Sequence, residues 1–211
     1  MSESFQSLAE QLALISRNFY MRGWVLGTSG NFSAVVSREP FRLAMSPNGV
    51  DKGALTANQI LLIDERVETV DDRKVKPSDE SPLHIRIVNE LEAGAVLHTH
   101  SIWSTTLSDL RAADGGLAIE GYEMLKGLEG VQTHEHRAWL PIIENSQNMT
   151  ALADNVSAAL AEHPNAHGFL LRRHGLYTWG KDLAQAKRHV EILEFLLEAV
   201  GRTRLMRPDQ S

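Results

Sequence analysis

The sequence predicts a single α/β domain whose sheet is mixed or antiparallel rather than doubly wound. Three observations predict this fold class. Several long segments carry apolar residues at helical spacing, short apolar runs between them have the length of strands, and some of these runs are joined as hairpins. No repeat, low-complexity tract or linker divides the 211 residues. We therefore expect one domain over residues 1–211, with a disordered tail at about 207–211.

The expected helices are amphipathic segments bounded by capping or breaking residues. Helical spacing of apolar residues predicts a first helix over residues 1–20. Ser81 followed by Pro82 is typical of an N-cap and a first helical position, and Gly94 lies beyond the end of that helix. One later helix is expected to begin at Ser101 or Ser104. Two more are expected to run from Met149 to near His163-Pro164 and from about Asp182 to Arg204.

The expected strands are short apolar runs next to turn signals. They cover residues 32–36, 41–45, 61–63, 95–97, 139–143, 167–171 and 176–179. The first two strands, and the last two, are close enough in sequence to form hairpins. The segments 64–76 and 112–130 are expected to be loops.

Composition excludes several classes of protein. The net charge is −6, which argues against nucleic acid as the main partner. No apolar run reaches the roughly 20 residues that a bilayer-spanning helix needs, and the N-terminus lacks the features of a signal peptide. There is no cysteine, so a transition metal would need His, Asp or Glu ligands. We expect a soluble cytoplasmic protein without a membrane partner.

His98 and His100 follow a buried strand and are the first metal-ligand candidates. Alternate residues of a strand face the same side, so both imidazoles could hold one ion. A catalytic zinc ion usually takes three protein ligands, and His174, before Gly175, is the best third candidate. The alternative is that these histidines make ordinary hydrogen bonds. His134 and His136 have the same spacing in a polar stretch, which favours a solvated loop.

Two glycine-containing loops are candidates for binding an anion. Gly30 and Asn31 end the first, and Asn48 and Gly49 end a turn that precedes Lys52 in the second. Backbone N–H groups in such loops can face a phosphate, and a lysine would add a positive charge. Each loop alone could equally be an ordinary turn with a solvated lysine. Neither has the Walker or the dinucleotide-binding pattern.

Glu80 and Glu123 are the acid–base candidates. Glu80 lies just before a predicted helix, and Glu123 lies in a loop near Lys126. Most carboxylates are solvated surface charges, so neither position is specific by itself. A metal enzyme without cysteine would nevertheless need such a group to carry protons.

Together these segments resemble the class II aldolase family over nearly the whole chain. The matching segments are Gly27–Ser33, Ser46–Gly49, Pro77–Glu80, His98–His100 and His174–Leu176, in that order. The resemblance implies a three-layer α/β/α domain around a mostly antiparallel sheet. It also implies that His98, His100 and His174 hold one Zn²⁺ per subunit, with another divalent metal possible.

The same resemblance implies a small ketose phosphate as the substrate. Asn31, Asn48–Gly49 and Ser78 would hold its phosphate, whereas Asp79, an acid next to a dianion, is left outside that site. Family members are usually tetramers with sites at subunit interfaces, so a homotetramer is expected.

A narrower resemblance indicates a branch of the family that dehydrates its substrate. The segments 123–127, 141–145 and 172–175 carry it, and it implies that Glu123 is the acid–base residue. Glu80 then has a secondary acid–base or substrate-binding role. The alternatives are an aldolase or epimerase that uses Glu80, and a non-catalytic binding module like the adducin head.

Overall fold

The computed structural model describes residues 3–71 and 73–206, so the tail expected at 207–211 lies outside the described residues. Its helices are α1 (Phe5–Met21), α2 (Ser81–Glu90), α3 (Ile102–Leu110), α4 (Met149–Glu162) and α5 (Leu183–Met206), with short 3-10 turns η1 (Ala57–Gln59), η2 (Ala112–Asp114) and η3 (Glu123–Gly127). Its strands are β1 (Asn31–Arg38), β2 (Phe41–Met45), β3 (Leu61–Ile63), β4 (Ala95–Thr99), β5 (Gly116–Ile119), β6 (Ala138–Ile143), β7 (Gly168–Leu171) and β8 (Gly175–Gly180).

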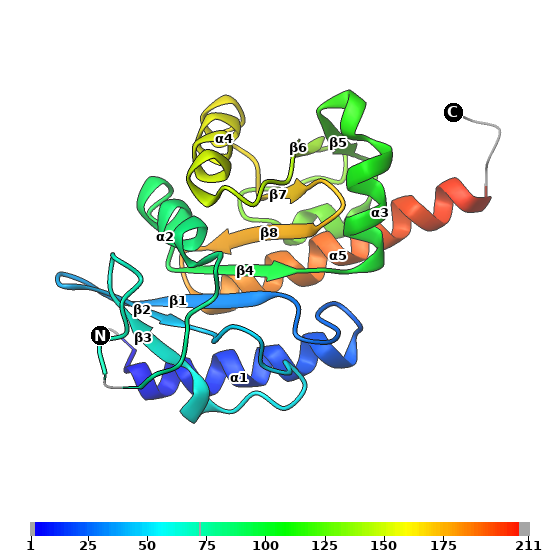
Figure 1. Ribbon diagram of the computed structural model, residues 1–211. Helices are drawn as coiled ribbons and strands as arrows, with labels where there is room; N and C mark the ends of the chain where they lie inside the picture. The colour runs from blue at the N-terminus through cyan, green and yellow to red at the C-terminus, as the bar shows by residue number, and fades with distance from the viewer. Residues whose placement is uncertain (1–2, 72, 207–211) are drawn as a thin grey trace.

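The strands form one sheet in the order β3-β2-β1-β4-β8-β7-β6-β5 (Figure 1). Neighbouring strands are antiparallel except for the parallel pair β6 and β7. The predicted mixed, mostly antiparallel sheet is therefore confirmed. At its centre β4 lies between β1 and β8, and the register places His98 opposite Asn31 on one side and Tyr177 on the other.

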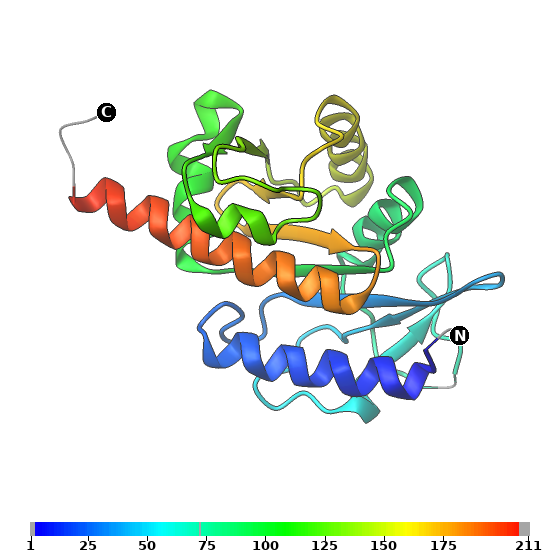
Figure 2. The ribbon, with the colours of Figure 1, turned by 180° about the vertical axis from the view of Figure 1, so that it is seen from behind.

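Helices cover both faces of the sheet, which confirms the three-layer α/β/α architecture. One apolar core lies between the sheet and the pair α2 and α4. On the opposite face, α1 and the first half of α5 cover a second core, and α3 with the rest of α5 covers a third. Figure 2 shows α1 and α5 in front of the sheet on that face. Among the described residues, none of the helices has both the length and the hydrophobicity to cross a membrane.

The side chains of β4 alternate between these two faces. Val96 belongs to the core under α2 and α4, whereas Leu97 belongs to the core under α1 and α5. His98 therefore points to the α2 side and Thr99 to the α5 side, where its hydroxyl donates to Glu194.

Two details of the predicted elements are wrong. The N-cap of α2 is Glu80 rather than Ser81, and the Glu80 side chain makes no capping hydrogen bond. Ser81 instead donates its hydroxyl to the Ser78 carbonyl. The predicted loop at 112–130 contains the edge strand β5, whose four residues follow Gly115 and pair with β6.

Candidate metal centre

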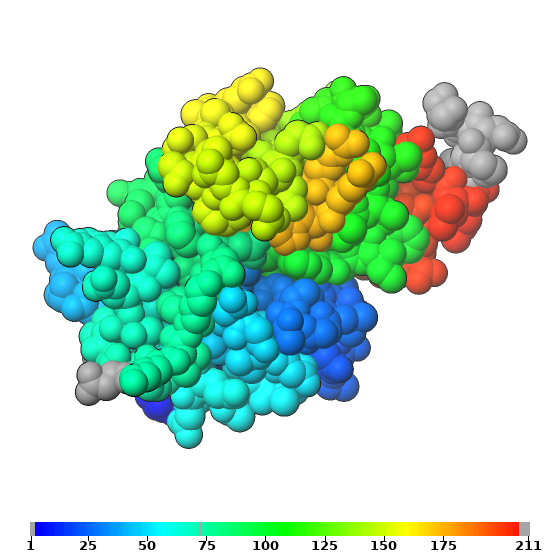
Figure 3. Space-filling view, viewed as in Figure 1, coloured from blue at the N-terminus to red at the C-terminus, as the bar shows by residue number. Residues whose placement is uncertain are grey.

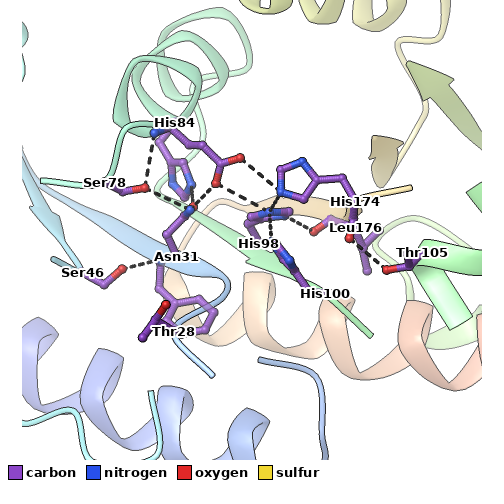
Figure 4. A network of polar contacts seen from close by, with 12 residues as sticks. Thr28, Asn31, Ser46, Ser78, His84, His98, His100, Thr105, His174 and Leu176 are labelled. Atoms are coloured by element: carbon purple, nitrogen blue, oxygen red, sulfur yellow. Dashed lines mark hydrogen bonds and ion pairs between the residues drawn. The ribbon is translucent and has the colours of Figure 1, made fainter. Parts of the chain in front are cut away.

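Three histidine side chains converge where β4 ends beside the turn between β7 and β8. His98 lies on β4, His100 follows it, and His174 lies in the turn. The Nε2 atom of His98 is 2.7 Å from Nε2 of His100 and 3.3 Å from Nε2 of His174 (Figure 4). This trio was predicted from the sequence, and the fold brings its three side chains together.

The surroundings of His98 leave its Nε2 free to bind a cation. Its Nδ1 lies 3.0 Å from the Leu176 carbonyl oxygen, an acceptor that fixes the proton on Nδ1. Its ring stacks on Tyr177, with centroids 3.8 Å apart. These two contacts hold the imidazole plane, and its remaining lone pair points towards His100 and His174.

Burial keeps the three imidazoles neutral. Together with smaller effects of neighbouring histidines, it lowers the pKa of His98 well below the usual value and the pKa of His100 to about 3. Burial also lowers the pKa of His174, although the Glu80 carboxylate acts in the opposite direction. Neutral imidazoles are the form that binds metals.

The trio fits a divalent metal ion with nitrogen preference. If all three Nε2 atoms are unprotonated, their lone pairs converge at these separations, and a cation between them would be coordinated by all three. Three histidines are a typical ligand set of catalytic zinc, and they also suit other first-row metals. Among residues 3–71 and 73–206, this trio is the group of His, Asp or Glu side chains with metal-binding geometry.

Two glycines allow neighbouring backbone to approach the ligand strand. A Cβ on Gly175 would lie 2.0 Å from the Thr99 carbonyl oxygen. A Cβ on Gly30, whose φ is +72°, would lie 2.8 Å from the His98 carbonyl oxygen. Any larger residue at either position would push β8 or the start of β1 away from β4.

A cavity of about 270 Å³ opens beside the trio. It is lined by His100, His174 and Glu80 and by all six residues predicted to bind phosphate, which are Gly30, Asn31, Asn48, Gly49, Lys52 and Ser78. Figure 3 shows the face where blue and cyan N-terminal segments meet green, yellow and orange segments from later in the chain. The cavity is thus assembled from loops that are distant in sequence.

Lys52 supplies a buried positive charge to this cavity. The side chain is 1% exposed, and its Nζ donates to the carbonyl oxygens of Thr28 and Val50 at 3.1 and 3.0 Å. Burial lowers its pKa to about 8, while Asp51 raises it. Asp79 also reaches the cavity, but its carboxylate pairs with Lys76 at 2.5 Å.

The two glutamates lie in very different places. The Glu80 side chain is 16% exposed, and its carboxylate oxygens lie 3.4 Å from Nε2 of His174 and 3.7 Å from Nε2 of His98. The Asn31 amide donates to the same carboxylate. Glu80 is therefore next to any ion that the trio binds.

Glu123 is outside the cavity of its own chain. Its side chain is 72% exposed and pairs with Lys126 at 2.6 Å and with His134 at 3.6 Å. The Lys126 hydrogen bond and charge lower the pKa of this carboxyl group. Its turn, η3, packs against α5 (Figure 2), where Glu123 lines a shallow apolar depression with Met124 and Phe195.

Sequence reasoning missed two polar residues behind the site. His84 is fully buried in α2 and contacts the Asn31 amide, and Glu194 of α5 contacts Thr99 between two of the histidines. His84 lies one helical turn after Glu80, a spacing that places the two side chains on one side of α2. That spacing was the available signal for His84, whereas nothing in the local sequence identifies the partner of Glu194.

A known domain family matches most of the chain. The family model described as class II aldolase and adducin N-terminal domain matches residues 10–200. A methylthioribulose-1-phosphate dehydratase of Sorangium cellulosum is 40% identical over 196 residues, which cover 92% of each chain. The protein of that name from Methylococcus capsulatus is 42% identical over 199 residues, or 94% of this chain and 95% of its own.

The fold has also been seen in a solved structure of related architecture. The crystal structure of L-fuculose-1-phosphate aldolase from Thermus thermophilus superimposes with a TM-score of 0.76. The match covers 96% of this chain and 98% of that one at 20% identity. At this identity the similarity concerns the fold.

Proposed function

Because this chain belongs to the class II aldolase and adducin family, we propose that its histidine trio serves a methylthioribulose-1-phosphate dehydratase. The reaction removes water from 5-methylthioribulose 1-phosphate and yields 2,3-diketo-5-methylthiopentyl 1-phosphate, a step of methionine salvage. Two relatives with this name, at 40% and 42% identity over more than nine tenths of the chain, support the assignment.

One observation carries the proposal. The three neutral imidazoles lie at the edge of a cavity that is also lined by Lys52, Asn31 and Ser78. A metal site and an anion-binding site in one cavity suit a small phosphorylated ketose, since its carbonyl oxygen can bind a metal ion and its phosphate group can bind the anion site.

We propose that one Zn²⁺ per subunit is held by His98, His100 and His174. Bound there, the ion would act as a Lewis acid that polarises the ketose carbonyl and makes the neighbouring C–H more acidic. The Leu176 carbonyl would keep the His98 imidazole in the ligating tautomer.

The chain's own residues would position the substrate and move its protons. Lys52, Ser78 and the backbone of Gly30 and Gly49 would hold the phosphate, which fixes the distance of the reacting carbons from the trio. A carboxylate would take the proton from C3, and the carboxylic acid so formed would return a proton to the C4 hydroxyl group, which leaves as water. The resulting enol would become the diketone by proton transfer.

Glu123 is the proposed base, and its place on the surface implies that it acts on a neighbouring subunit. Its ionised carboxylate is exposed beside an apolar depression rather than in its own cavity. A homotetramer with sites at subunit interfaces would bring this residue to the trio of another copy. Glu80 would then assist by contacting the substrate or a metal-bound water.

The proposed function is tested by incubating the purified protein with methylthioribulose 1-phosphate and recording diketone absorbance, with and without a chelator. We expect metal-dependent water loss and about one zinc ion per chain by elemental analysis. Aldehyde release from the same substrate, or no reaction by the zinc-loaded protein, would contradict the dehydratase assignment.

Two conservative variants separate the roles of the glutamates. Glu123→Gln should keep metal binding and lose turnover by about 10²-fold or more, the usual range for a proton-transfer residue. Glu80→Gln should lose less turnover than Glu123→Gln. Near-normal turnover of Glu123→Gln would contradict the role proposed for Glu123.

Co-expression of differently tagged variants tests whether Glu123 acts across an interface. Glu123→Gln and His98→Ala should each be inactive alone. If Glu123 serves another subunit, mixed oligomers regain part of the activity, because some sites combine an intact trio with an intact Glu123. Mixed oligomers with no activity would place Glu123 and the trio of one chain in the same site.

A sugar-phosphate aldolase or epimerase is the second candidate function. The observation that favours it is the position of Glu80, 3.4 Å from Nε2 of His174 within one chain. In that case Glu80→Gln would abolish turnover and Glu123→Gln would not. A non-catalytic, adducin-like module would bind no metal, which the elemental analysis tests.

A further inference from the structure

His84 lies at the centre of a buried chain of hydrogen bonds behind the cavity. Its Nδ1 is 2.8 Å from the Ser33 hydroxyl, and its Nε2 is 2.5 Å from Oδ1 of Asn31. The Asn31 amide nitrogen in turn contacts the Glu80 carboxylate and lies 3.1 Å from the Ser78 hydroxyl. Figure 4 shows Asn31 between His84 and Ser78.

The direction of the hydrogen bonds in this chain follows from the Asn31 amide. Its NH₂ group donates to the Glu80 carboxylate and faces the Ser78 hydroxyl, so Oδ1 faces His84. Because Oδ1 also only accepts, the His84 proton must be on Nε2. Its Nδ1 then accepts from the Ser33 hydroxyl.

The opposite orientation of Asn31 would leave acceptors facing each other. It would place Oδ1 against the Glu80 carboxylate and the NH₂ group against His84. Packing holds the His84 ring in one orientation. The residue is 0% exposed, and its ring packs edge-on against Tyr177 with the ring centroids 5.8 Å apart. Burial also lowers the pKa of His84 to about 3, so the ring carries a single proton.

We propose that His84 is a positioning residue whose Nε2–H fixes the Asn31 amide, which in turn holds the Glu80 carboxylate beside His98 and His174. The inference rests on the proposed function for its kinetic consequence. His84 touches neither the cavity nor the metal ligands' nitrogen atoms, so it acts through Asn31.

The fixed amide also prepares Ser78 for the phosphate. The Ser78 oxygen faces the Asn31 amide nitrogen at 3.1 Å and the Glu80 backbone N–H at 3.3 Å. Both neighbours are donors, so the Ser78 hydroxyl proton is available to donate into the cavity that this residue lines. His84 thereby controls a donor for the substrate as well as a carboxylate.

The first test is independent of activity. Nitrogen-15 NMR of the histidine rings in the holoenzyme should show His84 as the Nε2–H tautomer, with assignment by comparison with His84→Gln. Ser33→Ala should weaken this preference, because it removes the donor to Nδ1. A predominant Nδ1–H tautomer in the wild type would overturn the inference.

The second test uses turnover of methylthioribulose 1-phosphate. His84→Leu removes the donor, and we expect kcat/KM to fall by about tenfold or more, the equivalent of one buried hydrogen bond. His84→Gln can place an amide N–H near the former Nε2 and should recover most of this loss. Metal content should be unchanged in both variants.

A double-mutant cycle and a matched control separate positioning from a general loss of stability. In an Asn31→Ala background, His84→Leu should have little further effect on kcat/KM. His189→Leu replaces another buried histidine, which contacts Trp179 and Glu129 instead, and should leave kcat/KM unchanged. Equal losses in His84→Leu and His84→Gln, or additive losses with Asn31→Ala, would contradict the proposal. If the wild type does not turn over this substrate, the proposed function fails, and the NMR result still decides the role of His84.

Discussion

Lys52 shows how a single side chain can tune the cavity. Its ammonium group has three protons, and two of them are directed at the carbonyl oxygens of Thr28 and Val50. The third is available for an anion. Burial disfavours the charged form of Lys52 and lowers its pKa to about 8. A phosphate bound in the cavity would stabilise that charged form.

Lys52→Met is expected to raise KM for the phosphorylated substrate by about tenfold or more, since hydrogen bonds to charged groups contribute roughly 1.5–3 kcal/mol. The value of kcat should change less. Lys76→Met is the matched control, because Lys76 pairs with Asp79 at the surface. An unchanged KM in Lys52→Met would remove this residue from the phosphate site.

The pH dependence of KM tests the same charge. With a pKa of about 8, Lys52 is mostly protonated at pH 7 and mostly neutral at pH 9. KM of the wild type should therefore rise between pH 7 and pH 9, and KM of Lys52→Met should change little over that range. Parallel profiles for the two proteins would contradict the prediction.

At the scale of elements, the contact between α5 and β4 supports the histidine trio from behind. Glu194 is 2% exposed, and it accepts a hydrogen bond from Thr99, the residue between His98 and His100. Its other carboxylate oxygen is buried without a partner. Burial raises the pKa of Glu194 to about 7, and the nearby hydroxyl groups of Ser101 and Thr99 oppose this effect.

This raised pKa makes the stability of the α5–β4 contact depend on pH. Folding favours the protonated form of Glu194. Its contribution to the free energy of unfolding is therefore lost as pH rises from about 4.5, the pKa in the unfolded chain, to above 7. The loss is at most about 3 kcal/mol.

Glu194→Gln should therefore be more stable than the wild type at pH 8, with a smaller difference at pH 5. Thermal unfolding of both proteins at both pH values, with Glu198→Gln as the control on the same helix, measures this effect. A pH-independent difference would show that Glu194 is charged in the folded protein.

Most elements were predictable because their signals are local. Helical periodicity and alternation over short apolar runs identified the five helices and seven of the eight strands. The strand β5 was missed because it is short, begins with a glycine, Gly116, directly after another, and depends on pairing with β6. The α2 boundary moved by one residue because the Glu80 carbonyl accepts the first backbone hydrogen bonds of the helix, from Leu83 and His84.

The site was predictable to a smaller degree than the fold. Alternation placed His98 and His100 together. His174, which is 74 residues beyond His100, was a candidate from its place before Gly175, and the family resemblance strengthened that choice. The contacts of His84 with Asn31 and of Glu194 with Thr99 form only when distant elements pack. In the proposed oligomer Glu123 would act on a second chain, and local sequence patterns carry no information about such a contact.

At the scale of the whole molecule, a bound metal would link the centre of the sheet to the turn between β7 and β8. Any ion that binds the folded state alone stabilises it, by about 2.7 kcal/mol at 100 times its dissociation constant. Chelation should therefore lower the melting temperature of the wild type by several degrees. His174→Ala should melt at the same temperature with and without the chelator. A wild type that is insensitive to chelation while retaining one zinc ion per chain in its absence would contradict this coupling.

The central position of β4 also has a consequence for protein synthesis. On one side β4 pairs with β1, which the ribosome completes earlier, and on the other with β8, which emerges later. The four strands β3, β2, β1 and β4 can thus associate while the C-terminal part is still being made. The third histidine is made 74 residues after the second, so we expect tight metal capture only after these four strands have been able to associate.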